Sequence, residues 1–217
     1  MVSEFSPSQT LRGDPPEVTR RDFVYIATGA SLAIGGLLAS WPLVAQMEPS
    51  SDVLAAGGPI NVDVSSISPG QQILVMWRAR PVFIVHRTGP ILSKLRSPDL
   101  LALLRDPASN EFQQPQYAKN WCRSIRPEFL VLVGVCTHLG CIPTFEPTIG
   151  AVSQSWPGGY LCHCHGSKYD LAGRVFRGVP APYNLPVPPY HFEGESTVVI
   201  GENPKGEAYS LSAIEQI

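Results

Sequence analysis

The chain has 217 residues, enough for one domain of ordinary size with appendages, and 44% of them are hydrophobic, so a sizeable core can form. Its formal net charge is only −2, which argues against a nucleic-acid partner. Five cysteines are too few for a disulfide scaffold. The many prolines (22) and glycines (19) favour a β-rich, loop-rich structure.

The first 47 residues are organised like a membrane anchor. Thr19-Arg20-Arg21-Asp22-Phe23 resembles a twin-arginine export signal, in which paired arginines precede an apolar run. Residues 23–47 carry no charge and, at about 1.5 Å per residue, exceed the roughly 30 Å core of a bilayer. We therefore expect a cytoplasmic segment with this signal at residues 1–22 and a retained transmembrane helix at residues 23–47.

Basic residues set the expected orientation of this helix. Arg12, Arg20 and Arg21 precede the span, whereas the first basic residue after it is Arg78. The positive-inside rule then places the N-terminus in the cytoplasm and the rest of the chain outside. Twin-arginine export carries proteins that have already folded.

Residues 48–59 lack apolar periodicity, and fully extended they could span roughly 40 Å. We interpret them as a flexible hinge between the anchor and a head at residues 60–217.

The head begins with β patterns and returns to them near its end. Strands are predicted at residues 60–64, 72–77, 80–86, 129–135, 174–177, 190–193, 196–200 and 207–211. Arg78-Ala79 is short enough for a tight hairpin turn. A helix is predicted at about 98–105, with Ser97 as its N-cap, and residues 108–127 are predicted to be irregular.

Two short stretches carry the chemistry: Cys136-Thr137-His138-Leu139-Gly140-Cys141 and Cys162-His163-Cys164-His165-Gly166-Ser167. Each offers a thiolate and an imidazole at loop spacing, together with a second cysteine. Two cysteines plus two histidines form the ligand set of a 2Fe–2S cluster whose second iron is held by nitrogen. Zinc also accepts these ligands, but it does not account for the second cysteines or for the Gly-Ser-x-Tyr sequence that follows.

The ligand types predict how such a centre behaves. Replacing two thiolates with neutral imidazoles removes two negative charges, so the centre accepts an electron more easily and its potential rises. The ring nitrogen that does not bind iron can carry a proton, whose affinity rises on reduction. These properties indicate a high-potential carrier suited to a donor that gives up hydrogen, such as a quinol.

The pattern C-T-H-L-G-C followed by C-x-C-H-G-S resembles the Rieske iron–sulfur proteins of cytochrome bc complexes, and the likeness runs from the twin arginines essentially to the C-terminus. The resemblance implies an all-β fold, with an antiparallel Rieske-type head, a small cluster-binding subdomain at about 129–188, and one N-terminal transmembrane helix. It implies one 2Fe–2S cluster whose irons are bound by two pairs of side chains: Cys136 with Cys162, and His138 with His165.

The resemblance also assigns roles around the cluster. Cys141 and Cys164 would form a disulfide that clamps the two loops. Ser167 would donate a hydrogen bond to a bridging sulfide, and Tyr169 would donate one to the sulfur of Cys136. His165 would contact the quinol, and residues 178–182 would form a proline loop that covers the cluster.

The implied function is electron transfer within ubiquinol–cytochrome c reductase, a translocase. The head would take one electron and a proton from ubiquinol and pass the electron to a c-type cytochrome by moving about the hinge. The expected partners are a cytochrome b subunit, a c-type cytochrome and ubiquinol, in a dimeric complex of the bacterial inner (plasma) membrane with the head in the periplasm. Two alternatives remain: a Rieske subunit of another membrane-associated respiratory oxidoreductase, such as an arsenite oxidase, and a Rieske ferredoxin feeding an oxygenase.

Three residues or segments depart from the family pattern or lie outside it. His163 stands where the family usually has proline, and we interpret it as a non-ligand because the Cys-x-x-His spacing from Cys162 selects His165. The segment between Cys141 and Cys162 is somewhat long, so residues 144–156 are interpreted as a surface loop. Cys122 is interpreted as an inert buried thiol.

Overall fold

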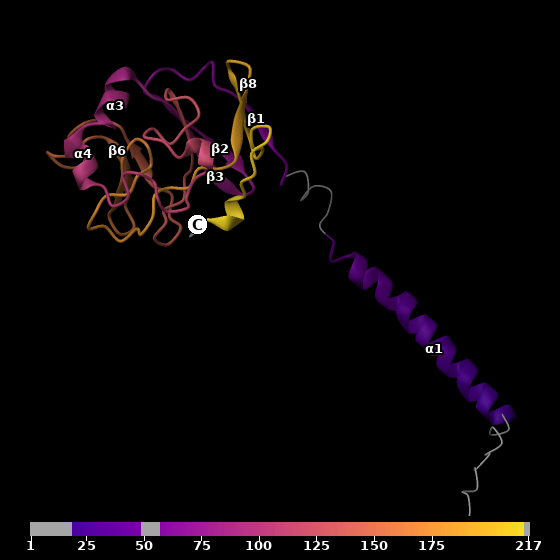
Figure 1. Ribbon diagram of the computed structural model, residues 1–217. Helices are drawn as coiled ribbons and strands as arrows, with labels where there is room; N and C mark the ends of the chain where they lie inside the picture. The colour runs from indigo at the N-terminus through magenta and orange to yellow at the C-terminus, as the bar shows by residue number, and fades with distance from the viewer. Residues whose placement is uncertain (1–18, 49–56, 215–217) are drawn as a thin grey trace, which may run out of the picture. The chain divides into compact units, whose positions relative to one another are not determined.

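The computed structural model describes residues 19–48 and 57–214. The chain divides into two compact units, Met1–Ser50 and Ser51–Ile217. The first contains helix α1 (Arg20–Ala45), and the second is the head (Figure 1). Most of the predicted hinge and of the predicted cytoplasmic segment lies outside the described residues.

Helix α1 begins at the paired arginines because the residue before them caps it. The Thr19 hydroxyl accepts a hydrogen bond from the backbone N–H of Asp22 (3.3 Å), and the Asp22 carboxylate accepts one from the backbone N–H of Thr19 (3.0 Å). This reciprocal capping box fixes the start of the helix three residues before the predicted apolar span. The 26-residue helix is long and apolar enough to cross a bilayer, and its side chains are exposed throughout.

The described head contains three antiparallel sheets of three strands each. The first sheet has the order β1 (Ile60–Asp63), β9 (Thr197–Ile200), β8 (Tyr190–Glu193). The second has the order β2 (Gln72–Trp77), β3 (Arg80–His86), β4 (Phe129–Val133). The third has the order β5 (Thr144–Glu146), β6 (Gly159–Cys162), β7 (Ser167–Tyr169). These sheets confirm the antiparallel β head.

The second sheet forms the centre of the head. Arg78 and Ala79 connect β2 to β3 with φ angles of 50° and 57°, the left-handed conformation that matches the twist of a two-residue hairpin. Every residue of β4 is buried, as are Pro81 to Val85 of β3. Both faces of these strands are covered, so their sequences are continuous apolar runs without alternation of apolar and polar residues.

Aromatic stacking joins the third sheet to the second. The ring of Tyr160 in β6 stacks on Phe83 of β3 with centroids 5.5 Å apart, and Phe145 of β5 packs on Tyr160 at the same separation. A single hydrophobic core cluster includes buried residues of all three sheets. The third sheet is therefore built on the strands of the central sheet.

A second hydrophobic cluster lies under two short helices, α3 (Gly89–Lys94) and α4 (Pro98–Leu103). Its largest side chains are Trp156 and Phe176, whose rings stack with centroids 6.0 Å apart. In Figure 1, α3, α4 and β6 lie at one end of the head, and β1 and β8 lie at the other.

Several elements differ from the predictions. Helix α4 ends at Leu103 because Leu104 is extended and pairs with Phe176 in an isolated bridge. The strand predicted at 174–177 is reduced to this bridge and a second one, between Tyr169 and Val175. The segment predicted as a strand at 207–211 contains instead the start of a 3-10 helix, η2 (Leu211–Ala213). A further 3-10 helix, η1 (Gln116–Ala118), lies in the region predicted to be irregular.

Candidate metal centre

The first motif forms a tight loop that follows β4. The Cys136 carbonyl accepts a hydrogen bond from Gly140 N–H (2.9 Å), and Cys136 N–H donates to the Cys141 carbonyl (2.8 Å). Gly140 has a φ of 82°, a conformation that costs a glycine little. The loop therefore returns Cys141 to the level of Cys136 and exposes its tip, where Leu139 is 70% exposed.

The second motif repeats this backbone design between β6 and β7. The Cys162 carbonyl accepts a hydrogen bond from Gly166 N–H (2.9 Å), and Gly166 has a φ of 76°. The spacing Cys-x-x-x-Gly is thus the shared sequence signal of the two loops. Cys162 ends β6 and Ser167 begins β7, so strand pairing between these residues closes the base of the loop.

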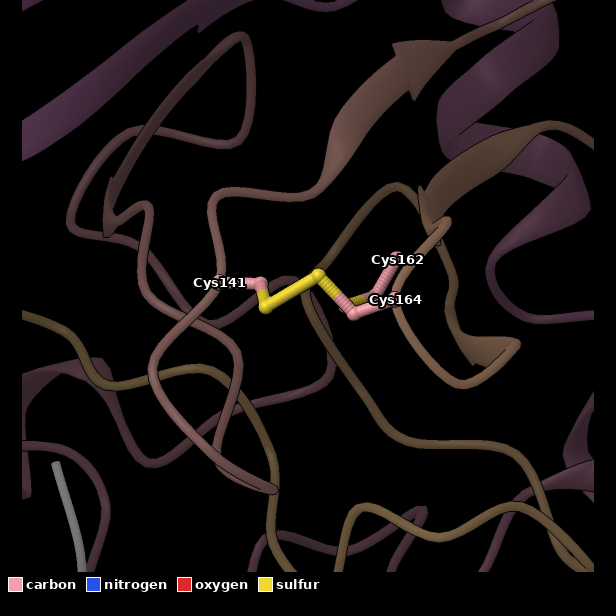
Figure 2. Close-up of side chains that lie close together, drawn as sticks. All are labelled: Cys141, Cys162 and Cys164. Carbon is pink, nitrogen blue, oxygen red and sulfur yellow. A yellow bond between two sulfur atoms is a disulfide. The ribbon is translucent and has the colours of Figure 1, made fainter.

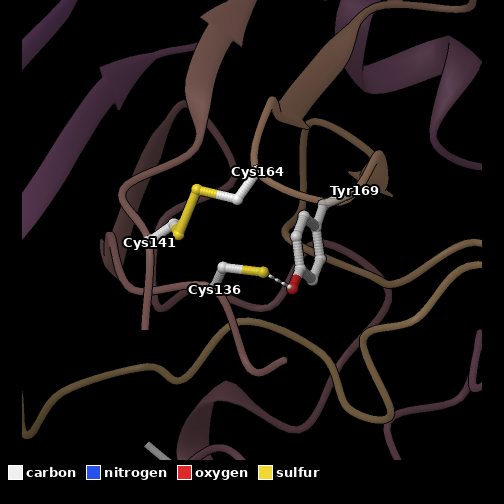
Figure 3. Close-up of a disulfide and its surroundings, with 4 residues drawn as sticks. All are labelled: Cys136, Cys141, Cys164 and Tyr169. Carbon is white, nitrogen blue, oxygen red and sulfur yellow. Dashed lines mark hydrogen bonds between the residues drawn. A yellow bond between two sulfur atoms is a disulfide. The ribbon is translucent and has the colours of Figure 1, made fainter. Parts of the chain in front are cut away.

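A disulfide joins the two loops. It links Cys141 to Cys164, the pair that the family resemblance suggests, with Cα atoms 6.7 Å apart (Figure 3). The two cysteines are 23 residues apart in the chain, and the bond joins the loop between β4 and β5 to the hairpin loop between β6 and β7.

The two loops bring two thiols and two imidazoles together. The thiol-bearing residues Cys136 and Cys162 are only 1% and 2% exposed. The rings of His138 and His165 are edge to face with centroids 4.7 Å apart, and His165 is exposed while His138 is half-buried. The centre therefore has sulfur donors on its inner side and nitrogen donors on its outer side.

The electrostatics of Cys162 suit a metal ligand. Burial raises the pKa of its thiol, and the neighbouring Cys136 thiol raises it further, whereas the backbone N–H groups of Cys164 and His165 lower it. A cation shared with the neighbouring sulfur reverses this effect, because it stabilises Cys162 as a thiolate. The donor set of two thiols and two imidazoles therefore fits a 2Fe–2S cluster with mixed ligands.

The sulfur atoms of Cys141, Cys162 and Cys164 lie within 4.8 Å of one another (Figure 2). This group is not itself a ligand set, because Cys141 and Cys164 are bonded to each other and offer no thiolate. Of the three, Cys162 alone is available as a sulfur ligand.

The hydroxyl of Tyr169 lies beside the sulfur of Cys136. This hydroxyl lies 3.2 Å from Cys136 Sγ (Figure 3). It also accepts a hydrogen bond from Thr137 N–H (3.1 Å). Burial strongly raises the pKa of Tyr169, so the phenol keeps its proton at neutral pH. A thiolate is a stronger acceptor than a neutral oxygen, so the phenol proton is directed to Cys136 when the sulfur is ionised.

Thr137 completes this arrangement, and the sequence did not point to it. Its hydroxyl donates to the Tyr183 carbonyl (2.7 Å) and lies 3.2 Å from the hydroxyl of Tyr169. Thr137 therefore connects the first loop to the segment after the predicted proline loop. The only sign of this contact in the sequence is a threonine inside the motif, and threonine is too common to be diagnostic.

Ser167 lies at the start of β7 and is completely buried. Its hydroxyl accepts a hydrogen bond from Ala181 N–H (3.1 Å), which ties residues 178–182 to the second loop. Because the oxygen is the acceptor in this bond, the hydroxyl proton remains for another acceptor.

A buried ion pair fixes the turn that follows Tyr169. Arg174 contacts the Asp170 carboxylate at 2.7 Å, and Asp170 also accepts hydrogen bonds from the backbone N–H groups of Ala172 (2.9 Å) and Arg174 (2.8 Å). Arg123, itself fully buried, donates to the carbonyls of Ala172 and Leu185 at 3.0 and 2.8 Å. These charged groups were not predicted as part of the site, and they hold β7 and the proline-rich segment in place.

Two further residues were predicted not to be ligands. His163 is exposed at the tip of the second loop. Cys122 is buried, and its thiol donates to the Asn120 side-chain oxygen at 3.0 Å, as an inert buried cysteine should.

Comparisons with known proteins agree with this chemistry. The family described as Rieske [2Fe-2S] domain matches residues 107–190, and the family described as ubiquitinol-cytochrome C reductase Fe-S subunit TAT signal matches residues 12–50. The chain is 46% identical over 186 residues to the ubiquinol-cytochrome c reductase iron-sulfur subunit of Allochromatium vinosum, covering 85% of this chain and 89% of the relative. It is 44% identical over 183 residues to the subunit of that name from Bradyrhizobium diazoefficiens, covering 84% and 94%.

Among solved structures, a chain of a hyperthermophilic respiratory Complex III aligns with a TM-score of 0.46 and 30% identity, covering 81% of this chain and 99% of that one.

Proposed function

Because the chain belongs to the family of ubiquinol–cytochrome c reductase iron–sulfur subunits, we propose that its Rieske 2Fe–2S cluster is held by four side chains of the two loops: Cys136, His138, Cys162 and His165. The chain is an electron-transfer subunit of that oxidoreductase, and the zinc alternative is set aside. The observation that carries the ligand assignment is the convergence of two buried thiols with two imidazoles nearer the surface.

When bound, the cluster supplies a one-electron acceptor of high potential, because its imidazole ligands are uncharged. The protein supplies the rest of the chemistry. Cys136 and Cys162 lie on the side of the centre that excludes water. The effective dielectric constant is low there, so nearby charges and dipoles interact strongly with the cluster. Tyr169 and Ser167 place hydroxyl donors there, and such donors stabilise added negative charge.

His165 and His138 form the side of the centre that partners can reach. His165 is exposed, so the ring nitrogen that does not bind iron can exchange a proton with a quinol hydroxyl or with solvent. Leu139 and Ile142, which are 70% and 57% exposed, give the loop tip an apolar surface that suits contact with a quinol or a partner subunit. We therefore assign quinol contact to His165.

The first unit, Met1–Ser50, supplies the membrane anchor and sets the orientation of the chain in the membrane. Helix α1 serves as a retained membrane anchor in the bacterial inner membrane, with residues 1–22 in the cytoplasm and the head in the periplasm. Residues 48–59 act as the hinge, residues 60–217 are the Rieske domain, and residues 129–188 are its cluster-binding subdomain. The partners are a cytochrome b subunit, a c-type cytochrome and ubiquinol, in a dimeric complex.

Isolation of the full chain from detergent-solubilised membranes tests this function. We expect an affinity tag at the C-terminus to recover cytochrome b and a c-type cytochrome, and we expect added ubiquinol to reduce the cluster in that complex. Recovery of a molybdenum-containing subunit instead, with no reduction by quinol, would show that the chain serves a different oxidoreductase.

A further inference from the structure

Cys162 lies beside a disulfide in which it takes no part. Its sulfur and the two sulfurs of the Cys141–Cys164 bond are all within 4.8 Å of one another, and Figure 2 shows the three side chains meeting between the loops. Thiol–disulfide exchange needs a thiolate that can reach a disulfide sulfur, and it needs no external oxidant or reductant. The described fold therefore places a thiol, which becomes the nucleophile when it ionises, next to the disulfide that joins the two loops.

We propose that, while no cluster is bound, Cys162 attacks the Cys141–Cys164 disulfide and that iron binding prevents this reaction. The inference rests on Cys162 being a cluster ligand, as proposed above. The Cys162 thiolate attacks Cys141 Sγ, the Cys141–Cys162 bond forms, and the Cys141–Cys164 bond breaks. Cys164 leaves as a thiolate and takes up a proton from solvent to replace the one that Cys162 lost, so the exchange involves no net oxidation.

The geometry favours Cys141 as the sulfur that is attacked. A Cys141–Cys162 bond joins the same two loops as the original bond does. A bond between Cys162 and Cys164 would instead close a ring within three consecutive residues, where short, stiff segments resist closure. The product also differs in accessibility, because Cys164 is exposed whereas Cys162 is 2% exposed. The exchange therefore converts a buried thiol into one that solvent can reach.

The proposed exchange sets the order in which the cluster and the disulfide must form. After exchange, Cys162 is no longer available as a ligand, so a disulfide that closes before the cluster arrives removes a ligand from the centre. A Cys162 sulfur that is bound to iron is no longer a free nucleophile, so the cluster protects the clamp. Insertion of the cluster must then precede stable closure of the disulfide.

Two variants of the full chain isolate the role of Cys162. Cys136→Ser and Cys162→Ser each lack one proposed ligand and differ from the parent by one atom, but only Cys136→Ser keeps the sulfur beside the disulfide. Both are purified in detergent without a cluster, incubated overnight without reductant and trapped with N-ethylmaleimide. The modified cysteines and the disulfide are then located by fragmenting the intact, non-reduced chains in the mass spectrometer. The long incubation is needed because uncatalysed rearrangements take minutes to hours.

In Cys136→Ser we expect N-ethylmaleimide on Cys164 together with a Cys141–Cys162 bond. In Cys162→Ser we expect Cys164 to remain unmodified within its original bond. Cys122 is the internal control for folding, because it is buried in the head, and only chains in which it is unmodified are counted. Unmodified Cys164 in Cys136→Ser, or equal modification of Cys164 in both variants, would overturn the proposal.

The parent chain provides the second measurement. With its cluster bound, it should show only the Cys141–Cys164 bond, and after chelation of the iron it should acquire the Cys141–Cys162 bond. Disulfide mapping does not depend on quinol or cytochrome partners, so a failure here is distinguishable from a failure of the proposed electron-transfer role.

Discussion

At the scale of single residues, the site depends on where each proton resides. Tyr169 receives a hydrogen bond from Thr137 N–H, and its own proton points to Cys136 Sγ or the Thr137 hydroxyl. The Thr137 proton is already used by the Tyr183 carbonyl. The phenol is thereby fixed as a donor, and its preferred acceptor becomes the Cys136 sulfur as negative charge accumulates there.

Tyr169→Phe should lower the midpoint potential of the cluster while the cluster remains bound. The lost donor stabilises the reduced state over the oxidised state by about 1–2 kcal/mol, which corresponds to roughly 40–90 mV for a one-electron couple. A redox titration monitored by electron paramagnetic resonance measures the shift.

Tyr160→Phe is the matched control for this substitution. Tyr160 pairs with Tyr169 across β6 and β7 and is equally buried, but its hydroxyl has no hydrogen-bond partner among the described residues. The control should leave the potential unchanged. An equal shift in the two variants would mean that bulk polarity, and not the bond to Cys136, sets the potential.

At the scale of elements, the metal-binding loops were predictable but their supports were not. Residue type and spacing are visible in the sequence, so both loops could be located from it, and the four donors proposed in them stay a prediction. The third sheet could not be located, because β5, β6 and β7 have only three or four residues each, too few to show a period of two. Its pairing is set by tertiary contacts such as the stacking of Tyr160 on Phe83.

Helix α3 was missed for a related reason. It has six residues and contains Gly89 and Pro90, so neither its length nor its composition indicates a helix. It is held by packing of Ile91 and Leu92 against the cluster around Trp156, and the sequence gives no sign of that partner. The strands of the central sheet were found because their apolar runs are continuous and longer.

Asp170→Asn should destabilise the proposed cluster-binding subdomain. The substitution leaves the buried Arg174 guanidinium without its counter-charge, and breaking a buried pair in this way costs about 3–5 kcal/mol. Denaturant unfolding of the full chain in detergent, followed by loss of the cluster's visible absorption, measures the change.

Asp106→Asn serves as the comparison. Asp106 is half-buried and accepts backbone hydrogen bonds from Asn110 and Glu111, without an ion pair among the described contacts. Its substitution should cost about 1 kcal/mol. If Asp170→Asn is no more destabilising than this, the buried ion pair does not secure the turn after β7.

At the scale of the whole molecule, the twin-arginine signal is the export signal that a protein carrying a cluster needs. The paired arginines open helix α1, where the capping box of Thr19 and Asp22 fixes the start of the helix. A chain whose cofactor is inserted before export needs a route that carries folded proteins. The order of maturation inferred from Cys162 makes the same demand, because cluster insertion comes before disulfide closure.

Replacing Arg20 and Arg21 together with lysine should block export without unfolding the head. The charge before the span is kept, so a loss of export would reflect recognition of the arginine pair itself. We expect the head to become resistant to protease added to spheroplasts, while Arg12→Lys leaves it accessible. A head that remains accessible in the double variant would show that the pair is not the export signal.

The central claim is that two imidazoles and two thiolates hold the cluster, and pulsed electron paramagnetic resonance of dithionite-reduced membranes tests it most directly. In cells grown with ¹⁵N-histidine, the spectrum should show two strongly coupled nitrogens whose couplings scale with the isotope, and His163→Asn should leave both in place. A cluster without histidine nitrogen couplings, or one that loses a nitrogen in His163→Asn, would contradict the assignment of His138 and His165.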